Sequence, residues 1–313
     1  MNGCFDSRLF MKTKFHSGSP QLGDGGPIVY PLALGCMGMS GMYGASDDDE
    51  SIATIHAALD HGVTLLDTGG FYGMGRNELL IGRALKGHGG KALLSVKFGA
   101  LRTPDGGWGG VDGRPASVKN FAAYSLNRLG VDHIDIYRLS RLDPNVPIED
   151  TIGAIADLVK AGYVRYIGLP EVGVETIRKA HAVHPICDLE IEYALIGRSP
   201  EARIFPVLDE LGIGVTAYGV FSRGLLTGSV PAAMGDFLAH LPRFTGENGA
   251  RNRALVEELN RMAAERGLTA AQLLRECLEI TLPAIVWRTH SCVPCNALST
   301  PAPRDSSRHS FQL

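Results

Sequence analysis

The chain has 313 residues, 45% of them hydrophobic and 20% charged, with a formal net charge of −3, which is typical of a soluble globular protein and excludes a strongly basic nucleic-acid-binding or membrane-surface protein. Its six cysteines are too sparse for a disulfide framework, and no apolar run reaches the ~20 residues that span a bilayer. Because the N-terminus also lacks the pattern of a secretion signal, we expect a cytoplasmic protein without a membrane or nucleic-acid partner, whose oligomeric state the sequence leaves open.

Strand and helix signals alternate along most of the chain, after an N-terminal extension. Residues 1–26 are rich in Gly, Ser and charged side chains, and we expect them to be flexible. Apolar runs then predict strands at Pro31–Gly35, Thr64–Asp67, Leu93–Lys97, Ile134–Leu139, Val164–Leu169, Leu189–Tyr193 and Gly214–Tyr218. Helical periodicity predicts helices at Asp48–His61, Asn77–Lys86, Pro115–Leu129, Ile148–Ala161, Val174–His184 and Glu201–Leu211. Since repeated strand–helix units form parallel sheets with right-handed crossovers, this α/β alternation favours a closed (β/α)8 TIM barrel.

The regular pattern ends after Leu274. We assign residues 27–288 to the barrel, where only Ala284–Trp287 has the composition of an eighth strand. Residues 289–313 are rich in Ser, Pro, Thr and Arg and cannot bury a helix face, which predicts a disordered tail and an altered or incomplete last strand–helix unit. A barrel without that unit would expose two sheet edges. The abrupt change resembles a shifted reading frame or a mis-spliced end, and a genuine divergent tail is the alternative.

An Asp, a Tyr and a Lys lie at the ends of two successive predicted strands. Asp67 and Tyr72 follow the second strand, and Lys97 ends the third, at the end of the barrel where active sites are found. Reduction of a carbonyl leaves an alkoxide that needs a proton, and a Tyr with an ordinary pKa of about 10 releases its proton more easily beside a cation. Lys97 would supply the cation, and Asp67 would hold it by a charge-assisted hydrogen bond. The three residues together predict a proton donor for carbonyl reduction. The plainer interpretation is that Asp67 caps a strand end, Tyr72 packs in a loop and Lys97 is a surface charge.

No residue pattern indicates a metal site, but one loop indicates a wall of a substrate site. The histidines are scattered, and Cys292 and Cys295 have no second ligand pair at zinc spacing. The run Gly106-Gly107-Trp108-Gly109-Gly110 predicts a loop over the barrel mouth, or a surface turn. Together with Phe71 and Phe221, Trp108 would give an apolar wall suited to an aromatic or medium-sized carbonyl substrate.

Several motifs follow one another in a fixed order. They are Leu34-Gly35-Cys36-Met37-Gly38-Met39, Leu66-Asp67-Thr68-x-x-Phe71-Tyr72-Gly73, Leu129-Gly130-Val131-Asp132-x-Ile134-Asp135, Gly162-x-Val164-Arg165-x-Ile167-Gly168 and Arg223-Gly224-Leu225-Leu226-Thr227-Gly228. In this order they resemble the aldo-keto reductase superfamily, from about Pro31 to about Glu276. The resemblance implies a TIM-barrel oxidoreductase that binds NADPH in an extended form and reduces an aldehyde or ketone to an alcohol.

The same resemblance assigns roles to individual residues. It implies that Asp67, Tyr72, Lys97 and Ser140 are the catalytic set, with Tyr72 as general acid. Tyr218 matches the aromatic residue on which the family stacks the nicotinamide, and the segment that starts at Arg223 matches part of the loop near the pyrophosphate. The residues implied in cofactor binding are Gly35, Met37, Asp67, Glu171, Glu190, Tyr218, Gly219, Ser222, Arg223, Gly224 and Leu225.

Four positions depart from the family pattern. Ser140 stands where the family usually has His, and a hydroxyl donates one hydrogen bond but cannot carry the charge of an imidazolium. Pro170-Glu171 replaces Ser-Asn, and Glu190 replaces Gln, in the clamp for the nicotinamide amide; an ionised Glu accepts hydrogen bonds but donates none. We therefore expect a narrow substrate scope. The alternative function is a non-catalytic barrel that senses its cofactor, or an inactive relic of a reductase.

Overall fold

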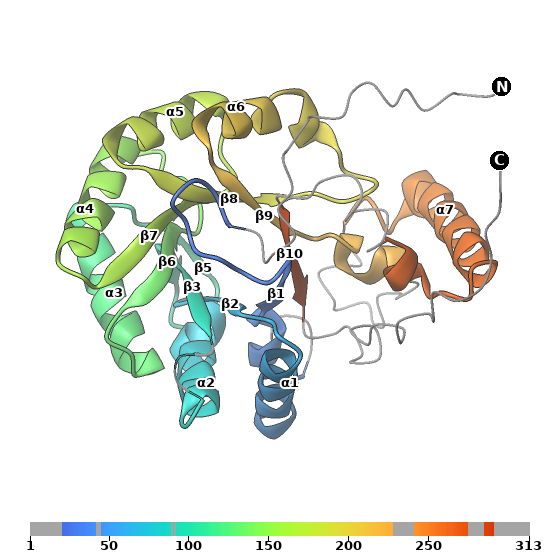
Figure 1. Ribbon diagram of the computed structural model, residues 1–313, viewed down its shortest axis with the longest axis horizontal. Coiled ribbons are helices and arrows are strands. Elements are labelled where there is room, and N and C mark those ends of the chain that lie inside the picture. The colour runs from blue at the N-terminus through green and yellow to red at the C-terminus, as the bar shows by residue number, and fades with distance from the viewer. Residues whose placement is uncertain are drawn as a thin grey trace, which may run out of the picture.

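Eight segments of the chain pair side by side as the parallel strands of a barrel (Figure 1). The computed structural model describes residues 21–41, 45–88, 90, 92–227 and 241–274, and the backbone of residues 285–290. The barrel strands are β1 (Leu32–Gly35), β2 (Leu65–Gly69), β3 (Leu93–Phe98), β6 (Ile134–Leu139), β7 (Val164–Leu169), β8 (Ile186–Glu192), β9 (Gly214–Tyr218) and β10 (Ile285–His290). They close in the order β1-β10-β9-β8-β7-β6-β3-β2, which confirms the predicted fold class.

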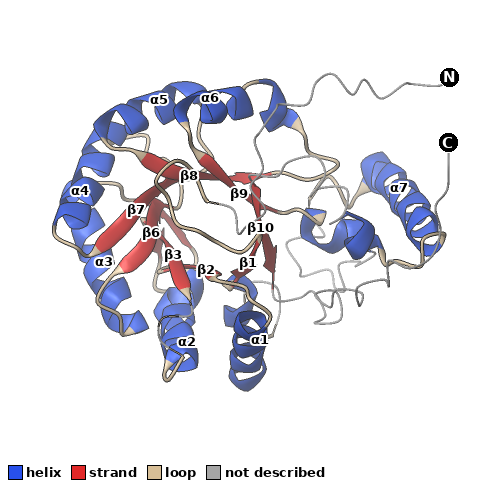
Figure 2. Cartoon of the chain, in the orientation of Figure 1, coloured by secondary structure: helices blue, strands red, loops and turns tan. Residues whose placement is uncertain are grey.

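Helices cover the outside of this barrel (Figure 2). They are α1 (Asp48–Asp60), α2 (Arg76–Leu85), α3 (Pro115–Leu129), α4 (Ile148–Lys160), α5 (Val174–Val183), α6 (Ile204–Leu211) and α7 (Gly246–Ala264), with 3-10 turns η2 (Met37–Ser40), η3 (Tyr72–Gly75), η4 (Ser199–Ala202) and η5 (Ser222–Thr227). In Figure 1, α7 stands apart from the ring formed by α1 to α6. It packs on η5 through Val256, which contacts Leu225 and Leu226 in a separate apolar cluster. Within the described residues, no helix has the length and hydrophobicity needed to cross a membrane.

The element bounds follow the apolar runs, with two informative differences. β6, β7 and β9 have the predicted bounds, whereas β8 begins at Ile186 and not at Leu189. Asp188 interrupts the apolar run there, but this carboxylate is fully buried inside the barrel. The helix predicted from Glu201 starts instead at Ile204, because the backbone of Arg203, with φ −135° and ψ −38°, breaks it into η4 and α6.

The eighth strand is present. β10 pairs in parallel with β9 on one side and with β1 on the other, so that Trp287 lies opposite both Ala217 and Leu32. The barrel therefore closes without the two exposed sheet edges that loss of this strand would leave, and the strand extends beyond the predicted Ala284–Trp287 to His290. Sheet pairing uses main-chain N–H and C=O groups, so the polar composition of residues 288–290 does not prevent it. The tail expected beyond that point lies outside the described residues.

A hairpin closes the amino-terminal end of the barrel. Gln21 pairs antiparallel with Ile28, the Leu22 N–H donates to the Pro27 carbonyl at 2.9 Å, and the side chain of Leu22 is fully buried. This side chain belongs to the cluster of Val29, Ala33, Leu65, Ile136 and Cys187 that fills the barrel floor. Residues 21–26, predicted to belong to the flexible extension, instead contribute Leu22 to the core, where this one side chain fills the open end of the barrel. Residues 1–20 lie outside the described part of the chain.

We expect Leu22→Ala to lower the free energy of unfolding by about 2–5 kcal/mol, because it leaves a cavity in the barrel floor. The matched control is Ile28→Ala on the same hairpin, where the side chain is 67% exposed and the expected change is within about 0.5 kcal/mol. Urea unfolding followed by circular dichroism measures both. Equal effects of the two substitutions would show that the hairpin does not seal the barrel.

The interior of the barrel changes from apolar to charged toward the carboxyl ends of the strands. Successive inward-facing residues of a strand are two apart, so β3 places Leu93 beside the floor, Ser95 in the middle and Lys97 near the top. The middle layer consists of side chains at most 1% exposed: Asp67, Ser95, Arg138, Asp188 and Thr216. Barrel interiors are usually filled by branched apolar residues. Here an ionic layer lies directly beneath the barrel mouth.

Candidate active site

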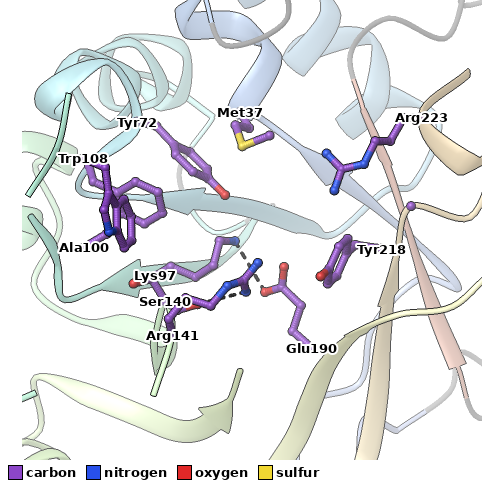
Figure 3. Close-up of a pocket in the computed structure, with 12 residues that line it drawn as sticks. Met37, Tyr72, Lys97, Ala100, Trp108, Ser140, Arg141, Glu190, Tyr218 and Arg223 are labelled. Atoms are coloured by element: carbon purple, nitrogen blue, oxygen red, sulfur yellow. Dashed lines mark hydrogen bonds and ion pairs between the residues drawn. The ribbon is translucent and has the colours of Figure 1, made fainter. Parts of the chain in front are cut away.

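A cavity of about 190 Å³ opens at the carboxyl ends of the strands (Figure 3). Of the residues assigned to the site from sequence, it brings together Met37, Tyr72, Lys97, Ser140, Glu190, Tyr218, Gly219 and Arg223. It adds Phe71, Ala100, Trp108 and Arg141. Trp108 belongs to a hairpin of β4 (Ala100–Arg102) and β5 (Trp108–Val111), which makes the Gly-rich run one wall of the cavity. Phe221 packs beside the α7 cluster and does not line the cavity.

Tyr72 is held at the cavity by an unusual turn after β2. It begins η3, in which Gly73, Met74 and Gly75 have φ values of 54°, 55° and 94°, a left-handed conformation that glycine adopts readily and Met rarely does. The Tyr72 ring packs edge-on against Phe71, with 4.6 Å between the ring centroids, and is 2% exposed. Figure 3 shows its hydroxyl directed toward the ammonium group of Lys97. The Nζ atom of Lys97 lies 5.4 Å from the centroid of the Tyr72 ring.

Lys97 lies between two carboxylates. Its ammonium group forms an ion pair with Oδ1 of Asp67 and lies 3.4 Å from Oε2 of Glu190. The other oxygen of Asp67 accepts a hydrogen bond from Ser95 Oγ at 2.9 Å. Asp67 is fully buried and Lys97 is 6% exposed, so water screens this pair little. The arrangement fixes a cation beside the Tyr72 ring.

The ion pairs continue into the barrel through Arg138. Its guanidinium lies 3.0 Å from Asp188 Oδ2 and 3.1 Å from Glu190 Oε2, and it donates to Ser95 Oγ at 3.1 Å. Burial alone would lower the pKa of Arg138, but the carboxylates Asp188, Glu190 and Asp67 raise it above its usual range. Burial raises the pKa of Asp188, although Arg138 opposes the shift. Arg138 thus links Asp188, inside the barrel, to Glu190, one of the two carboxylates that contact Lys97.

The strand between β6 and β8, which carry Arg138 and Asp188, leaves room for this ion pair. A Cβ atom at Gly168 of β7 would lie 2.5 Å from Asp188 Oδ1 and 3.0 Å from Arg138 Nε, closer than carbon atoms approach these groups. Sequence reasoning did not assign Arg138 or Asp188 to the site. A signal was present, since each is a charged residue inside an otherwise apolar strand, where charges are rare unless they are paired.

Tyr218 is fixed by Glu171 on its outer side. The Tyr218 hydroxyl donates to Glu171 Oε2 at 2.7 Å, and the same oxygen accepts from the Glu192 N–H at 3.4 Å. Burial, followed by the hydrogen bond to Glu171, raises the pKa of Tyr218 above its usual range. Glu171 and Glu190, which occupy the amide-clamp positions in the sequence, therefore both have partners within the protein. Glu171 does not line the cavity.

Ser140 and Arg141 follow β6 at the cavity wall. The Ser140 N–H donates to the Phe98 carbonyl at 2.7 Å, which fixes the backbone there. Ser140 is 6% exposed, and its hydroxyl has no hydrogen-bond partner among the described residues. The Arg141 guanidinium donates to the Ser140 carbonyl at 3.2 Å. Two hydrogen-bond donors thus lie next to each other at the end of one strand.

The segment after β9 carries backbone strain. Ser222, Arg223 and Gly224 have φ values of 50°, 60° and 90°, and such conformations in non-Gly residues cluster at ligand clamps. The Ser222 hydroxyl is buried without a partner among the described residues. Arg223 Nη2 lies 3.8 Å from Glu192 Oε2. The cation and the unused hydroxyl fit an anionic group such as a cofactor phosphate.

The remaining site residues lie around this cavity. Gly35 ends β1 opposite Asp67 in the neighbouring strand. Leu225 belongs to the apolar cluster that joins η5 to α7 and is not among the residues that line the cavity. No group of three or more potential metal ligands occurs within the described residues. Cys292 and Cys295 lie outside them.

Comparisons with known proteins agree on one family. The model of the aldo/keto reductase family matches residues 31–275. The glycerol dehydrogenase AKR11B4 from Gluconobacter oxydans is 28% identical, with a TM-score of 0.79 over 88% of this chain and 87% of that one. The aldo-keto reductase AKR11C1 from Bacillus halodurans is 27% identical, with a TM-score of 0.71 over 88% and 86%. An aldo/keto reductase from Klebsiella pneumoniae, solved with NADP and acetate, shares the fold at 22% identity and a TM-score of 0.67, over 88% and 85%.

Proposed function

The chain belongs to the aldo/keto reductase family, and on that premise we propose that it reduces an aldehyde or ketone to an alcohol with hydride from NADPH. The observation that carries the proposal is the position of Tyr72. Its hydroxyl is directed toward the buried Lys97–Asp67 ion pair, in a cavity that Tyr218 also lines. A small-molecule carbonyl compound is the partner that this cavity accommodates.

The residues of the chain divide the proton chemistry among them. Tyr72 donates a proton to the carbonyl oxygen as charge develops there, and the Lys97 cation stabilises the resulting phenolate. Asp67 holds the ammonium group in place, and Glu190 contacts it from the other side. The Ser140 hydroxyl donates a hydrogen bond to the same oxygen in place of the family His.

The described residues fit the cofactor at two points. Tyr218 presents its ring at the cavity for the nicotinamide, and Arg223 with Ser222 would hold the pyrophosphate. When bound, NADPH supplies the hydride. Lysine and arginine side chains at the cavity also favour the negative charge of the cofactor and of the developing alkoxide.

The second candidate function is a barrel that binds the cofactor but does not turn over a substrate. Its variant is a relic that has lost both cofactor binding and turnover. The specific observation in its favour is Ser140, since a hydroxyl cannot replace the charge or the proton exchange of an imidazolium. Glu171 and Glu190 add to it, because each already has partners within the protein and neither donates hydrogen bonds when ionised.

Titration of the full chain with NADPH, followed by turnover of a panel of carbonyl compounds, distinguishes these functions. Trp108 lies at the cavity and is 57% exposed, so its fluorescence reports on binding. We expect saturable quenching at micromolar concentrations and loss of NADPH absorbance when an aldehyde is added. Binding without turnover of any carbonyl would support the sensing barrel, and no binding by a chain that circular dichroism shows to be folded would support the relic.

A further inference from the structure

One cation at the cavity has no carboxylate partner in the part of the chain that the structure describes. Of the charged side chains that line the cavity, Lys97 pairs with Asp67 and Glu190, and Arg223 lies near Glu192. Arg141 has only the Ser140 carbonyl, a neutral acceptor, at 3.2 Å. Figure 3 shows its side chain reaching into the cavity from the end of β6, with the Tyr72 hydroxyl entering from the opposite side.

A second observation points to a ligand at the same place. The Ser140 hydroxyl lines the cavity, is buried from solvent and has no hydrogen-bond partner within the described ranges. A buried polar group without a partner costs about 1–3 kcal/mol, so such groups are usually completed by a ligand or water. The hydroxyl and the guanidinium belong to consecutive residues and both donate hydrogen bonds. They therefore form a donor pair, with Ser140 buried and Arg141 exposed, that suits an anionic acceptor in the cavity.

We propose that the substrate is a carbonyl compound carrying a carboxylate close to the carbonyl, and that Arg141 binds the carboxylate beside Ser140. This proposal rests on the proposed reductase function and specifies its substrate class. Guanidinium and carboxylate match in shape and bind through two parallel hydrogen bonds. A carboxylate suits the site better than a phosphate, because a monoanion matches Arg141, the one cavity cation without a carboxylate partner among the described residues, and the rest of the wall includes Phe71 and Trp108.

The field of Arg141 acts in the same part of the cavity. Arg141 lines the same cavity as Tyr218, the ring proposed to hold the nicotinamide, and its positive charge opposes the rise in the pKa of Tyr218. A carboxylate on Arg141 would then lie within a small cavity of about 190 Å³ that also holds Tyr72. A substrate whose carbonyl lies at Tyr72 and whose carboxylate lies at Arg141 therefore carries both groups within one small cavity.

The test compares benzaldehyde with 2-, 3- and 4-carboxybenzaldehyde as substrates of the full chain with NADPH. The ratio of kcat/KM for each carboxylate to that for benzaldehyde isolates the contribution of the anion. We expect at least one isomer to be favoured about ten- to hundredfold, the range for a hydrogen bond to a charged group, and the preference to weaken with salt. Arg141→Gln should reduce that ratio to near one, and Arg141→Lys should retain part of it.

The control is Arg178→Gln, which removes the same charge from an exposed pair with Glu210 on the outer helices and should leave the ratio unchanged. A wild-type ratio near one, or a high ratio that survives Arg141→Gln, overturns the proposal. The proposal is also overturned if Arg141→Gln weakens NADPH binding by as large a factor as it lowers the kcat/KM ratio, since Arg141 would then bind the cofactor.

Failure of the reductase function gives a different result. In that case wild type turns over none of the aldehydes, benzaldehyde included, and the anion site is tested by calorimetry with benzoate. Binding of benzoate that Arg141→Gln abolishes supports a carboxylate site at Arg141 even then. Absence of benzoate binding by the wild type overturns it.

Discussion

Tyr72→Phe is expected to lower kcat by about 10²- to 10⁴-fold, the usual contribution of a positioned general acid. The substitution removes one oxygen and keeps the ring packed against Phe71. NADPH titration should give nearly the same affinity as for the wild type, because the residues proposed to hold the cofactor, Tyr218 and Arg223, are untouched. Steady-state loss of NADPH absorbance with an accepted aldehyde measures the effect.

Tyr163→Phe is the matched control, since Tyr163 is 50% exposed and lies outside the cavity. It should retain the activity of the wild type. If Tyr72→Phe keeps more than about a tenth of the wild-type kcat, the general acid is another group and the assignment of Tyr72 is wrong.

Arg138→Met is expected to lower the free energy of unfolding by about 3–5 kcal/mol at neutral pH, the usual effect of removing one partner of a buried ion pair. Asp188 would be left buried without its cation, and Glu190 would keep only Lys97. Activity should fall with stability, because Glu190 would no longer be fixed beside Lys97. Urea unfolding and kcat of the same preparation test both effects.

The loss of stability in Arg138→Met should depend on pH. Burial already raises the pKa of Asp188 in the folded protein, and removal of the cation that opposes this shift raises it further. For an acid whose folded pKa is raised, stability is highest below the unfolded pKa, about 3.9 for Asp, and falls as pH rises through the folded pKa. The variant should therefore lie closest to the wild type near pH 4 and depart from it toward neutral pH. A difference that stays constant with pH would contradict an uncompensated carboxylate.

Two further variants separate charge from packing. The double variant Arg138→Met with Asp188→Leu should regain part of the lost stability, because apolar pairs often replace buried ion pairs at little cost. Arg178→Met removes an arginine from an exposed pair with Glu210 and should change stability by less than about 1 kcal/mol. If the double variant is no more stable than Arg138→Met, the guanidinium matters for its shape and not for its charge.

The sequence predicted most of the barrel because the strands are short apolar runs and the helices between them are periodic. β6, β7 and β9 have the predicted bounds. The candidate catalytic set was also predictable, because Asp67, Tyr72 and Lys97 follow strand ends and parallel strands bring those ends to one edge. The roles of these residues stay predictions until the variants are measured.

Other features depended on contacts between distant segments. Leu22 is one apolar residue in a polar stretch, and only the open end of the barrel makes it part of the core. The eighth strand ends in the polar residues 288–290, and only the two flanking strands supply backbone partners for this strand.

The sequence by itself determined the order of strands and helices and the placement of an Asp, a Tyr and a Lys at one end of the barrel, because both follow from local periodicity. Only the tertiary structure decided which charges pair. Arg138 meets Asp188 and Glu190, whereas Arg141 faces the cavity with no carboxylate partner among the described residues. The physical reason is that a charged side chain is either paired or solvated, and for Arg138 the choice depends on Asp188 and Glu190, which lie some fifty positions away in the chain.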